Sequence, residues 1–308
     1  PAAYRYILEG FWYWHNYPQD MGDDEARRVV REYFRRGRFD VGATCAGNHT
    51  HIYSGEELCR SIYTRKYFKE NWGLEPKTML MSDNPGISWS VVAPYCEAGV
   101  ENIVFAPNQW NPIPSTIWPC DTTVHLYTWN PDAGGGGNRV DVSYSSELPM
   151  VFYWESPDTG SKLLVWASTQ YTHGMHTFGL DAYGPLKDGE DVMIKTARQL
   201  ARLESRYPYD IWLADSYNDD EPANTKMADF CRSWNDRWAY PQFCTVGDLE
   251  MPFDYLRKNF GESIPTLRGE ITSGWLQHAA STPELLARKF AADRALTVAE
   301  GRAAIASA

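Results

Sequence analysis

The sequence lacks the short motifs that identify several large enzyme classes. It contains no G-x-S-x-G, no Walker loop and no G-x-G-x-x-G, so serine-hydrolase, P-loop and dinucleotide-binding interpretations have no support. The six cysteines form no C-x-x-C pair, which removes the usual zinc-ribbon and redox motifs, and we expect them to be free. No apolar run approaches the roughly 18 residues of a membrane span. No signal peptide precedes the first expected strand, so a cytoplasmic and a secreted location both remain open.

Basic residues are scarce relative to acids: 29 Lys and Arg face 40 Asp and Glu, for a formal net charge of -11. Nucleic-acid binding needs clustered Lys and Arg, so this balance argues against a phosphate-backbone ligand. Aromatic residues are abundant instead, with 13 Trp, 19 Tyr and 12 Phe. They can build a core and can also offer flat surfaces for stacking a ligand. We therefore expect a carbohydrate partner and no nucleic-acid or membrane partner, while the oligomeric state stays open.

Strands and helices alternate through the first hundred residues. Hydrophobic periodicity predicts strands over 4–14, 39–42, 77–83 and 100–105, and helices over 23–36 and 55–70. Ser54 is the expected N-cap of the second helix. This rhythm implies parallel strands with right-handed crossovers, and the chain length suits one large α/β barrel of about 250 residues.

The rhythm fails between Pro107 and Pro149, where Pro and Gly dominate, and we expect a long loop that is either a binding lid or a surface excursion. Beyond it, the pattern predicts a hairpin of 150–155 with 161–166, a helix over 188–205 and a strand over 209–214. A last strand-like segment ends at Glu270, and a final helix is expected from Thr282 onward.

Acids stand at three expected strand ends. Asp83 ends an apolar run, Asp219 lies in an acidic cluster after the strand over 209–214, and Glu270 follows the last strand. In parallel α/β folds the ligand site lies at the carboxyl ends of strands, and paired carboxylates are what glycoside hydrolysis needs. The alternatives are that Asp83 only caps the next helix and that the acidic cluster is a solvated turn.

The histidines give a weaker signal. His49 and His51 have the spacing that places two rings on one face of a strand, which would suit a metal, but no third ligand is identifiable and a loop is favoured. His173 follows the second strand of the hairpin and could border the same mouth as the acids.

Several segments together resemble a known family. The segment 77–89, K-T-M-L-M-S-D-N-P-G-I-S-W, is similar to a strand that ends in an acid and a turn in the catalytic domain of family 38 glycoside hydrolases, the α-mannosidases, and especially in divergent bacterial members. The segments 37–40, 55–58, 149–161 and 268–270 resemble other parts of that domain. The resemblance implies a seven-stranded β/α barrel, a retaining mechanism and one zinc ion. It predicts a barrel domain over 1–276 that lacks its first strand, and a helical segment over 277–308 that leads into a following domain.

The resemblance also implies roles for individual residues. Asp83 would be both nucleophile and zinc ligand, Asp219 would be the acid/base, and the expected substrate-binding residues are Trp89, His173, Tyr217 and Glu270. The family's other zinc ligands, a His-x-Asp motif on the first strand and a His in the following domain, have no counterpart here. We therefore expect this chain by itself to hold no zinc and to be inactive, as an incomplete barrel truncated at both ends.

Two further predictions and two alternatives complete the sequence-based picture. The strand ends at Asp83, Ala214 and Gly269 should meet at one mouth of a parallel sheet, and the carboxyls of Asp83 and Asp219 should lie about 5 to 6 Å apart. The alternatives are a non-catalytic carbohydrate-binding barrel and a polysaccharide deacetylase-like metal hydrolase, which would need an Asp and a His pair on its metal.

Overall fold

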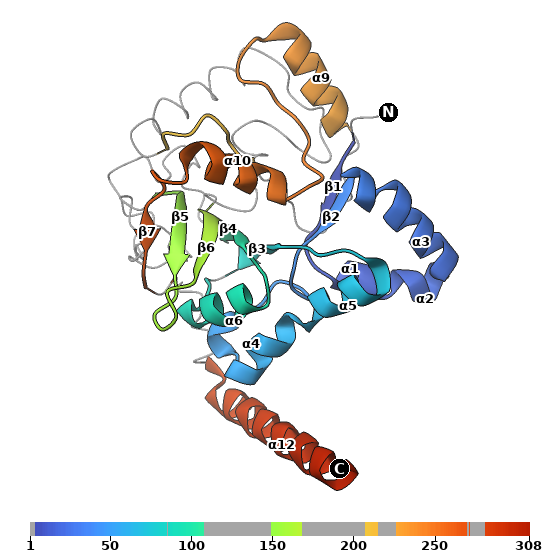
Figure 1. Cartoon of the computed structure of the whole chain (residues 1–308), viewed down its shortest axis with the longest axis vertical. Helices are drawn as coiled ribbons and strands as arrows, with labels where there is room; N and C mark the ends of the chain where they lie inside the picture. Colours follow the sequence, from blue (N-terminus) through green and yellow to red (C-terminus); the bar gives the residue numbers. More distant parts are fainter. Residues whose placement is uncertain are drawn as a thin grey trace.

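The computed structural model describes residues 4–84, 86–107, 149–167, 207–214, 226–269, 271 and 281–308. These residues form an α/β body from which one long helix, α12 (Pro283–Ser307), projects (Figure 1). Within this described part, no helix has both the length and the apolar character needed to cross a bilayer.

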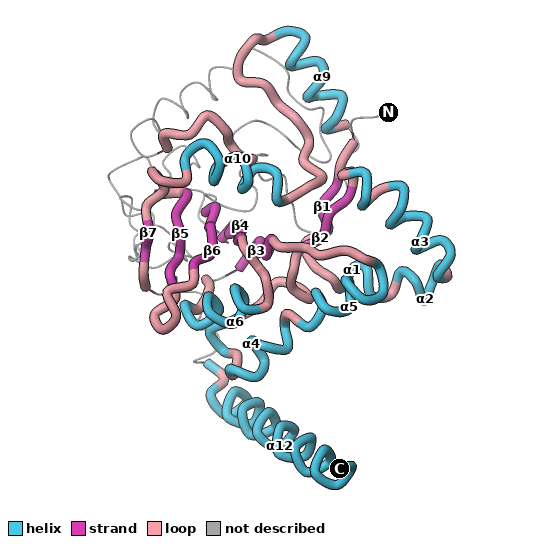
Figure 2. The backbone as a smooth tube through the Cα atoms, in the orientation of Figure 1, coloured by secondary structure: helices cyan, strands magenta, loops and turns pink. Residues whose placement is uncertain are grey.

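The strands form two sheets, shown as magenta segments in Figure 2. In the first, β1 (Tyr6–Leu8) pairs in parallel with β2 (Phe39–Val41). The second has the order β3-β4-β6-β5-β7. Its strands are β3 (Thr78–Asn84), β4 (Asn102–Pro107), β5 (Val151–Glu155), β6 (Lys162–Ala167) and β7 (Thr266–Leu267).

Within the described residues, a backbone hydrogen bond connects the two sheets. The N–H of Ala43, just after β2, donates to the carbonyl of Thr78 at 2.9 Å, so β2 lies beside the start of β3. The seven strands of the described residues form no closed barrel, which corrects the expected seven-stranded closure for this part of the chain. The coarser α/β prediction is confirmed.

The direction of the last strands also differs from the prediction. β3, β4 and β6 run in parallel, but β5 pairs antiparallel with β6, as the predicted hairpin requires, and β7 pairs in parallel with β5. β7 therefore runs against β3, and the prediction of one parallel sheet is wrong for the strand before Gly269. The chain after β7 still returns to the chain after β3, because the N–H of Ile87 donates to the carbonyl of Ile271 at 2.8 Å.

Helices cover the sheets as Figure 1 shows. On the β1–β2 side, Phe11, Trp14, Phe34, Phe68 and Trp72 belong to one buried aromatic cluster, which explains much of the aromatic content. The helices of the N-terminal half are α1 (Trp12–His15), α2 (Tyr17–Met21), α3 (Asp23–Glu32), η1 (Phe34–Arg36), η2 (Thr50–Ile52), α4 (Gly55–Ser61), α5 (Tyr63–Trp72), η3 (Trp89–Val91) and α6 (Val92–Glu97). Later come α9 (Met227–Arg237) and α10 (Glu250–Phe260).

Three expected elements have different limits in the structure. The strand expected over 4–14 ends at Leu8, because Gly10 packs tightly on the carbonyl of Cys45 and the chain then turns into α1 and α2. The helix expected over 55–70 is divided at Ile62 into α4 and α5. No strand forms over 207–214, where the hydroxyl of Tyr207 donates to the carbonyl of Ile211 within the segment. The predicted long loop and the helix over 188–205 lie outside the described residues.

Candidate active site at the end of strand β3

Asp83 lies at the carboxyl end of β3, as the sequence predicts, in an unusual backbone conformation. Its φ is +54°, in the left-handed region that only Gly, Asn and Asp adopt readily. The pairing of β3 with β4 shifts register between Ser82 and Asn84, so Asp83 is the extra residue of a bulge. Bulges re-aim side chains next to functional sites. Asp83 does not cap a helix here, because the next helix begins at Trp89 with Ser88 as its N-cap.

The neighbours of Asp83 fix this bulge. The buried side chain of Asn84 donates to the carbonyl of Ser82 at 2.8 Å, across the residue between them. Gly47 leaves space for that amide, since a Cβ at position 47 would lie 3.0 Å from Asn84 Nδ2. The Ser82 hydroxyl is buried and has no hydrogen-bond partner among the described residues. The bulge is therefore supported from the side of the segment 42–48.

Glu9 is an acid beside Asp83 that the sequence analysis missed. It follows β1, and its Oε1 accepts a hydrogen bond from the N–H of Ser82 at 3.3 Å. Burial raises the pKa of Glu9, the Ser82 N–H opposes that shift, and the charge of Asp83 adds to it. Glu9 therefore holds a negative charge less readily than an ordinary glutamate. No local motif marks Glu9, because its approach depends on β1 lying close to β3.

Two exposed aromatic side chains follow Glu9 in the chain. Trp12 and Tyr13 are 58% and 62% exposed, although the neighbouring Phe11 and Trp14 are buried. Burial and then the charge of Glu9 raise the pKa of Tyr13, which places that ring within electrostatic reach of the acid pair. Exposed rings of this size at the edge of an acidic site are suited to stacking on a sugar.

Trp89, one of the predicted substrate-binding residues, lies in the segment that follows Asp83. Its indole N–H donates to the carbonyl of Glu155 at 2.7 Å, and its ring packs against the main hydrophobic core. This contact ties the segment after β3 to the end of β5. Its predicted role in sugar binding stays a prediction.

The other predicted site residues lie outside the described residues, namely Asp219, His173, Tyr217 and Glu270. The distance between Asp83 and Asp219 is therefore untested. His49 and His51 are placed: His49 precedes η2 and His51 lies within it, so the loop interpretation holds and the strand-face arrangement does not.

The described residues do not fit a zinc site at Asp83. The group of His, Cys, Asp and Glu found close enough together to hold a metal ion is Asp40, Asp248 and Glu250. Glu250 contacts Lys77 and Thr78 at the start of β3, the opposite end of the strand from Asp83. Asp83 is not a member of this group, so the described part of the chain offers no set of ligands that would complete a zinc site at Asp83.

Comparison with known proteins places this geometry in a family. The family model described as "Glycosyl hydrolases family 38 N-terminal domain" matches residues 2–270. No curated protein matches the chain.

Two solved structures share the fold. An α-mannosidase from Enterococcus faecalis V583 superposes with a TM-score of 0.63 at 14% identity, covering 88% of this chain and 26% of its own. A family 38 glycosyl hydrolase protein from Enterococcus faecalis superposes with a TM-score of 0.53 at 14% identity, covering 88% and 24% respectively. The chain therefore spans about a quarter of the length of these structures. With a family model matched over most of its length, the chain belongs to glycoside hydrolase family 38, of which it carries the N-terminal domain.

Proposed function

We propose that the protein is a retaining α-mannosidase-like glycosidase with Asp83 as its nucleophile and Asp219 as its acid/base. The observation that carries the proposal is Asp83 itself, an acid held on a bulge at the carboxyl end of a parallel strand in a family 38 domain. The α-mannosidase that superposes on the chain supports the choice of substrate class. The finer prediction of a seven-stranded barrel belongs to the same proposal.

The reaction would proceed in two displacements. A carboxylate oxygen of Asp83 attacks the anomeric carbon while Asp219 gives a proton to the departing glycosidic oxygen, which leaves a covalent glycosyl ester on Asp83. Water then attacks the same carbon as Asp219 takes a proton from it, and Asp83 leaves as a carboxylate. Each displacement inverts the anomeric centre, so the net result is retention.

Two features of the site support these roles. The left-handed backbone at position 83 holds the carboxylate clear of the ladder of β3, where it can approach a substrate. The pKa of Glu9 beside it is raised, chiefly by burial, so Glu9 holds a negative charge less readily than an ordinary glutamate. Trp12 and Tyr13 are exposed beside Glu9 and are our candidates for contact with the sugar rings.

The test is made in the natural full-length protein that carries this sequence. Asp83→Asn should reduce hydrolysis of an aryl α-mannoside by at least about 10³-fold, because the amide cannot form the glycosyl ester. Asn tolerates a positive φ, so the variant should fold as well as the parent. Asp236→Asn, which makes the same change on exposed α9, is the matched control and should keep full activity.

Trapping the intermediate separates the possible outcomes. A fluorinated mannosyl fluoride should label one peptide, and mass spectrometry should assign the sugar to Asp83. Activity that survives Asp83→Asn would overturn the nucleophile assignment. Sugar binding without hydrolysis would favour the non-catalytic binding protein, and metal-dependent release of acetate would favour the deacetylase.

A further inference from the structure

A second pair of acids joins helix α10 to the strands at the end of the fold away from Asp83. Asp40, in β2, is partly buried and accepts two backbone hydrogen bonds. Its Oδ1 accepts from the N–H of Val41 at 2.8 Å, and its Oδ2 accepts from the N–H of Leu249 at 2.7 Å. Leu249 immediately precedes α10, so Asp40 holds the start of this helix against β2.

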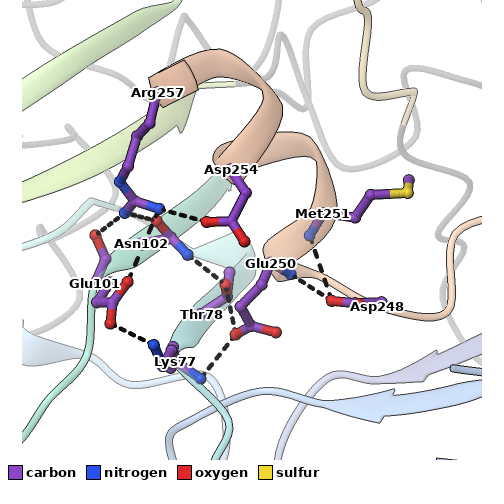
Figure 3. A network of polar contacts seen from close by, with 9 residues as sticks. All are labelled: Lys77, Thr78, Glu101, Asn102, Asp248, Glu250, Met251, Asp254 and Arg257. Atoms are coloured by element: carbon purple, nitrogen blue, oxygen red, sulfur yellow. Dashed lines mark hydrogen bonds and ion pairs between the residues drawn. The ribbon is translucent and has the colours of Figure 1, made fainter. Parts of the chain in front are cut away.

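Glu250, the first residue of α10, makes the same kind of connection to β3. Its Oε1 accepts from the N–H of Lys77 at 2.8 Å and from the hydroxyl of Thr78 at 3.2 Å, as Figure 3 shows. Carboxyl oxygens of Asp40, Asp248 and Glu250 all lie within 4.8 Å of one another. Asp40 and Glu250 thus bring two partly buried carboxyls together at the joint between helix and sheet.

The charges around this joint favour Glu250 as the ionised member. Lys77, from the chain before β3, and Arg65, from α5, both act on Glu250. Lys77 also pairs with Glu101 at 2.6 Å, and Arg257 of α10 lies 3.9 Å from the same carboxylate. The positive charges of Lys77 and Arg65 act in favour of an ionised Glu250, whereas the contacts of Lys77 and Arg257 with Glu101 stabilise the Glu101 carboxylate.

Asp40 is placed differently. Its charged neighbours include Glu250 and Asp248, both acids, and Asp248 is itself occupied in accepting the N–H groups of Glu250 and Met251 at 3.0 and 3.3 Å. Burial first, and then the charge of Glu250, raise the pKa of Asp40 to about 7. The pKa of Glu250 is also raised, with burial as the main cause.

We propose that Asp40 and Glu250 share one proton, which fastens the start of α10 to β2 and β3 in mildly acid solution and loosens this joint when it is lost. The protonated carboxyl of Asp40 donates to the carboxylate of Glu250, while both keep their backbone partners. Once the proton leaves, two adjacent buried carboxylates repel each other across the joint. The proposal is independent of the mannosidase activity.

The sign of the pH dependence follows from linkage. The pKa of Asp40 lies near 7 in the folded protein and at its ordinary value of 3.8 when unfolded, so the folded state binds more protons between these values. The stabilisation from this proton is present at a pH near 3.8 and is lost as the pH rises through about 7. The chain from α10 continues through β7 to Ile271, which is bonded to Ile87 just after Asp83, so loosening can reach the candidate site.

Thermal unfolding of this chain tests the proposal. Between about pH 5.5 and pH 8.5 the midpoint of the wild type should fall by several degrees. In Glu250→Gln, the amide oxygen can still accept from Lys77 and Thr78 and its NH₂ can donate to an ionised Asp40, so most of this fall should disappear. Glu262→Gln makes the same change of charge at an exposed site after α10 and should retain the wild-type fall.

Three results would overturn the proposal. The first is a Glu250→Gln midpoint with the wild-type dependence on pH. The second is a wild-type midpoint at about pH 8.5 that millimolar CaCl₂ restores in an EDTA-reversible way, because the acids would then bind a cation. The third is found without any variant at position 250: aspartate-selective ¹³C labelling should show a carboxyl signal that titrates near pH 7 and persists in Asp83→Asn, and its absence would exclude the shared proton.

Discussion

Among single residues, Gly42 makes the closest approach that concerns the candidate site. A Cβ at position 42 would lie 2.2 Å from the carbonyl oxygen of Glu9 and 3.3 Å from Cβ of Leu80, so β1, β2 and β3 meet there with no room for a side chain. Both contacts are with atoms that the backbone holds in place, the carbonyl oxygen of Glu9 and the Cβ of Leu80 in β3, so these neighbours cannot easily move. Gly42 therefore sets how closely Glu9 can approach β3.

Gly42→Ala should lower the free energy of unfolding by about 3 kcal/mol or more, since overpacking a close-packed contact costs about 1–3 kcal/mol even where the neighbours relax. Urea unfolding followed by tryptophan fluorescence measures the change. Gly55→Ala is the control: nothing lies within 4 Å of its Cβ at the start of α4, and it should be neutral or slightly stabilising. Equal effects of the two substitutions would contradict the close approach.

The sequence identifies one acid of the candidate site and misses the other for a physical reason. Asp83 is visible because it ends an apolar run that is followed by turn residues, and strand ends of this kind carry the ligand sites of α/β folds. Glu9 follows a short, half-buried strand with no special pattern. Its contact with Ser82 is a long-range consequence of strand order, which hydrophobic periodicity does not encode.

At the scale of elements, α4 is the described helix whose first backbone N–H groups are best provided with side-chain acceptors. The hydroxyl of Ser54 accepts from the N–H of Glu57 at 3.2 Å, and Glu57 Oε2 accepts from the N–H of Ser54 at 2.7 Å. This capping box confirms the predicted N-cap. Glu57 also contacts Lys289, so the cap is part of the connection between α4 and α12.

Ser54→Ala should reduce the free energy of unfolding by about 1 kcal/mol, because an N–H at the start of α4 loses its acceptor. Chemical denaturation monitored by circular dichroism gives the value. Ser307→Ala, at the exposed end of α12, removes a hydroxyl bonded only to Ala303 along its own helix and should change the value by a few tenths at most. A loss no larger than that of the control would mean that the cap contributes nothing.

Elements were predictable where the pattern was local. The turn over 157–160 between two β-rich runs predicts the β5–β6 hairpin, and the last helix, expected from Thr282, begins one residue later at Pro283. β7 could not be oriented from its sequence, because its direction depends on pairing with β5 and not on its own residues. The run 209–214 is expected to be a core strand; Tyr209 is buried, but an apolar segment can be buried without joining a sheet.

For the molecule as a whole, the loosest attachment in the described part is that of α12. None of its residues is buried, and Leu285 and Ile305 are 66% and 79% exposed. Polar contacts attach it to the body: Lys289 donates to the carbonyl of Ile52 at 2.8 Å, and Arg60 pairs with Glu300. The predicted boundary between residues 276 and 277 remains a prediction, and the exposed helix agrees with a segment that belongs to another part of the protein.

Deleting residues 283–308 should lower the thermal midpoint of the body by only a few degrees, since exposed ion pairs contribute about 0–1 kcal/mol each. The small loss should shrink further in 1 M NaCl, which screens such pairs. Differential scanning calorimetry with and without salt measures both effects. Collapse of the cooperative transition would show instead that α12 is an integral part of the body.

The fold class and family were accessible from the sequence, while closure of the sheet was not. Alternation of strands and helices establishes an α/β body, and family 38 membership rests on residues spread from 2 to 270. Whether seven strands close into a barrel depends on partners for β1 and β7, the two ends of the strand order. Those partners are set by long-range pairing, which local patterns do not specify.

The β5–β6 hairpin, which lies next to the edge strand β7 of the large sheet, has a consequence for the order of assembly. The hairpin closes across a turn of a few residues, which takes microseconds, whereas the contact between Trp154 and Gly269 spans 115 residues and must overcome a large loop-closure entropy. The edge of β5 that later pairs with β7 is therefore formed early in refolding and stays unpaired until that long-range contact is made. Such an edge can pair with the same strand of another chain, so concentration during refolding should govern how much of the protein aggregates.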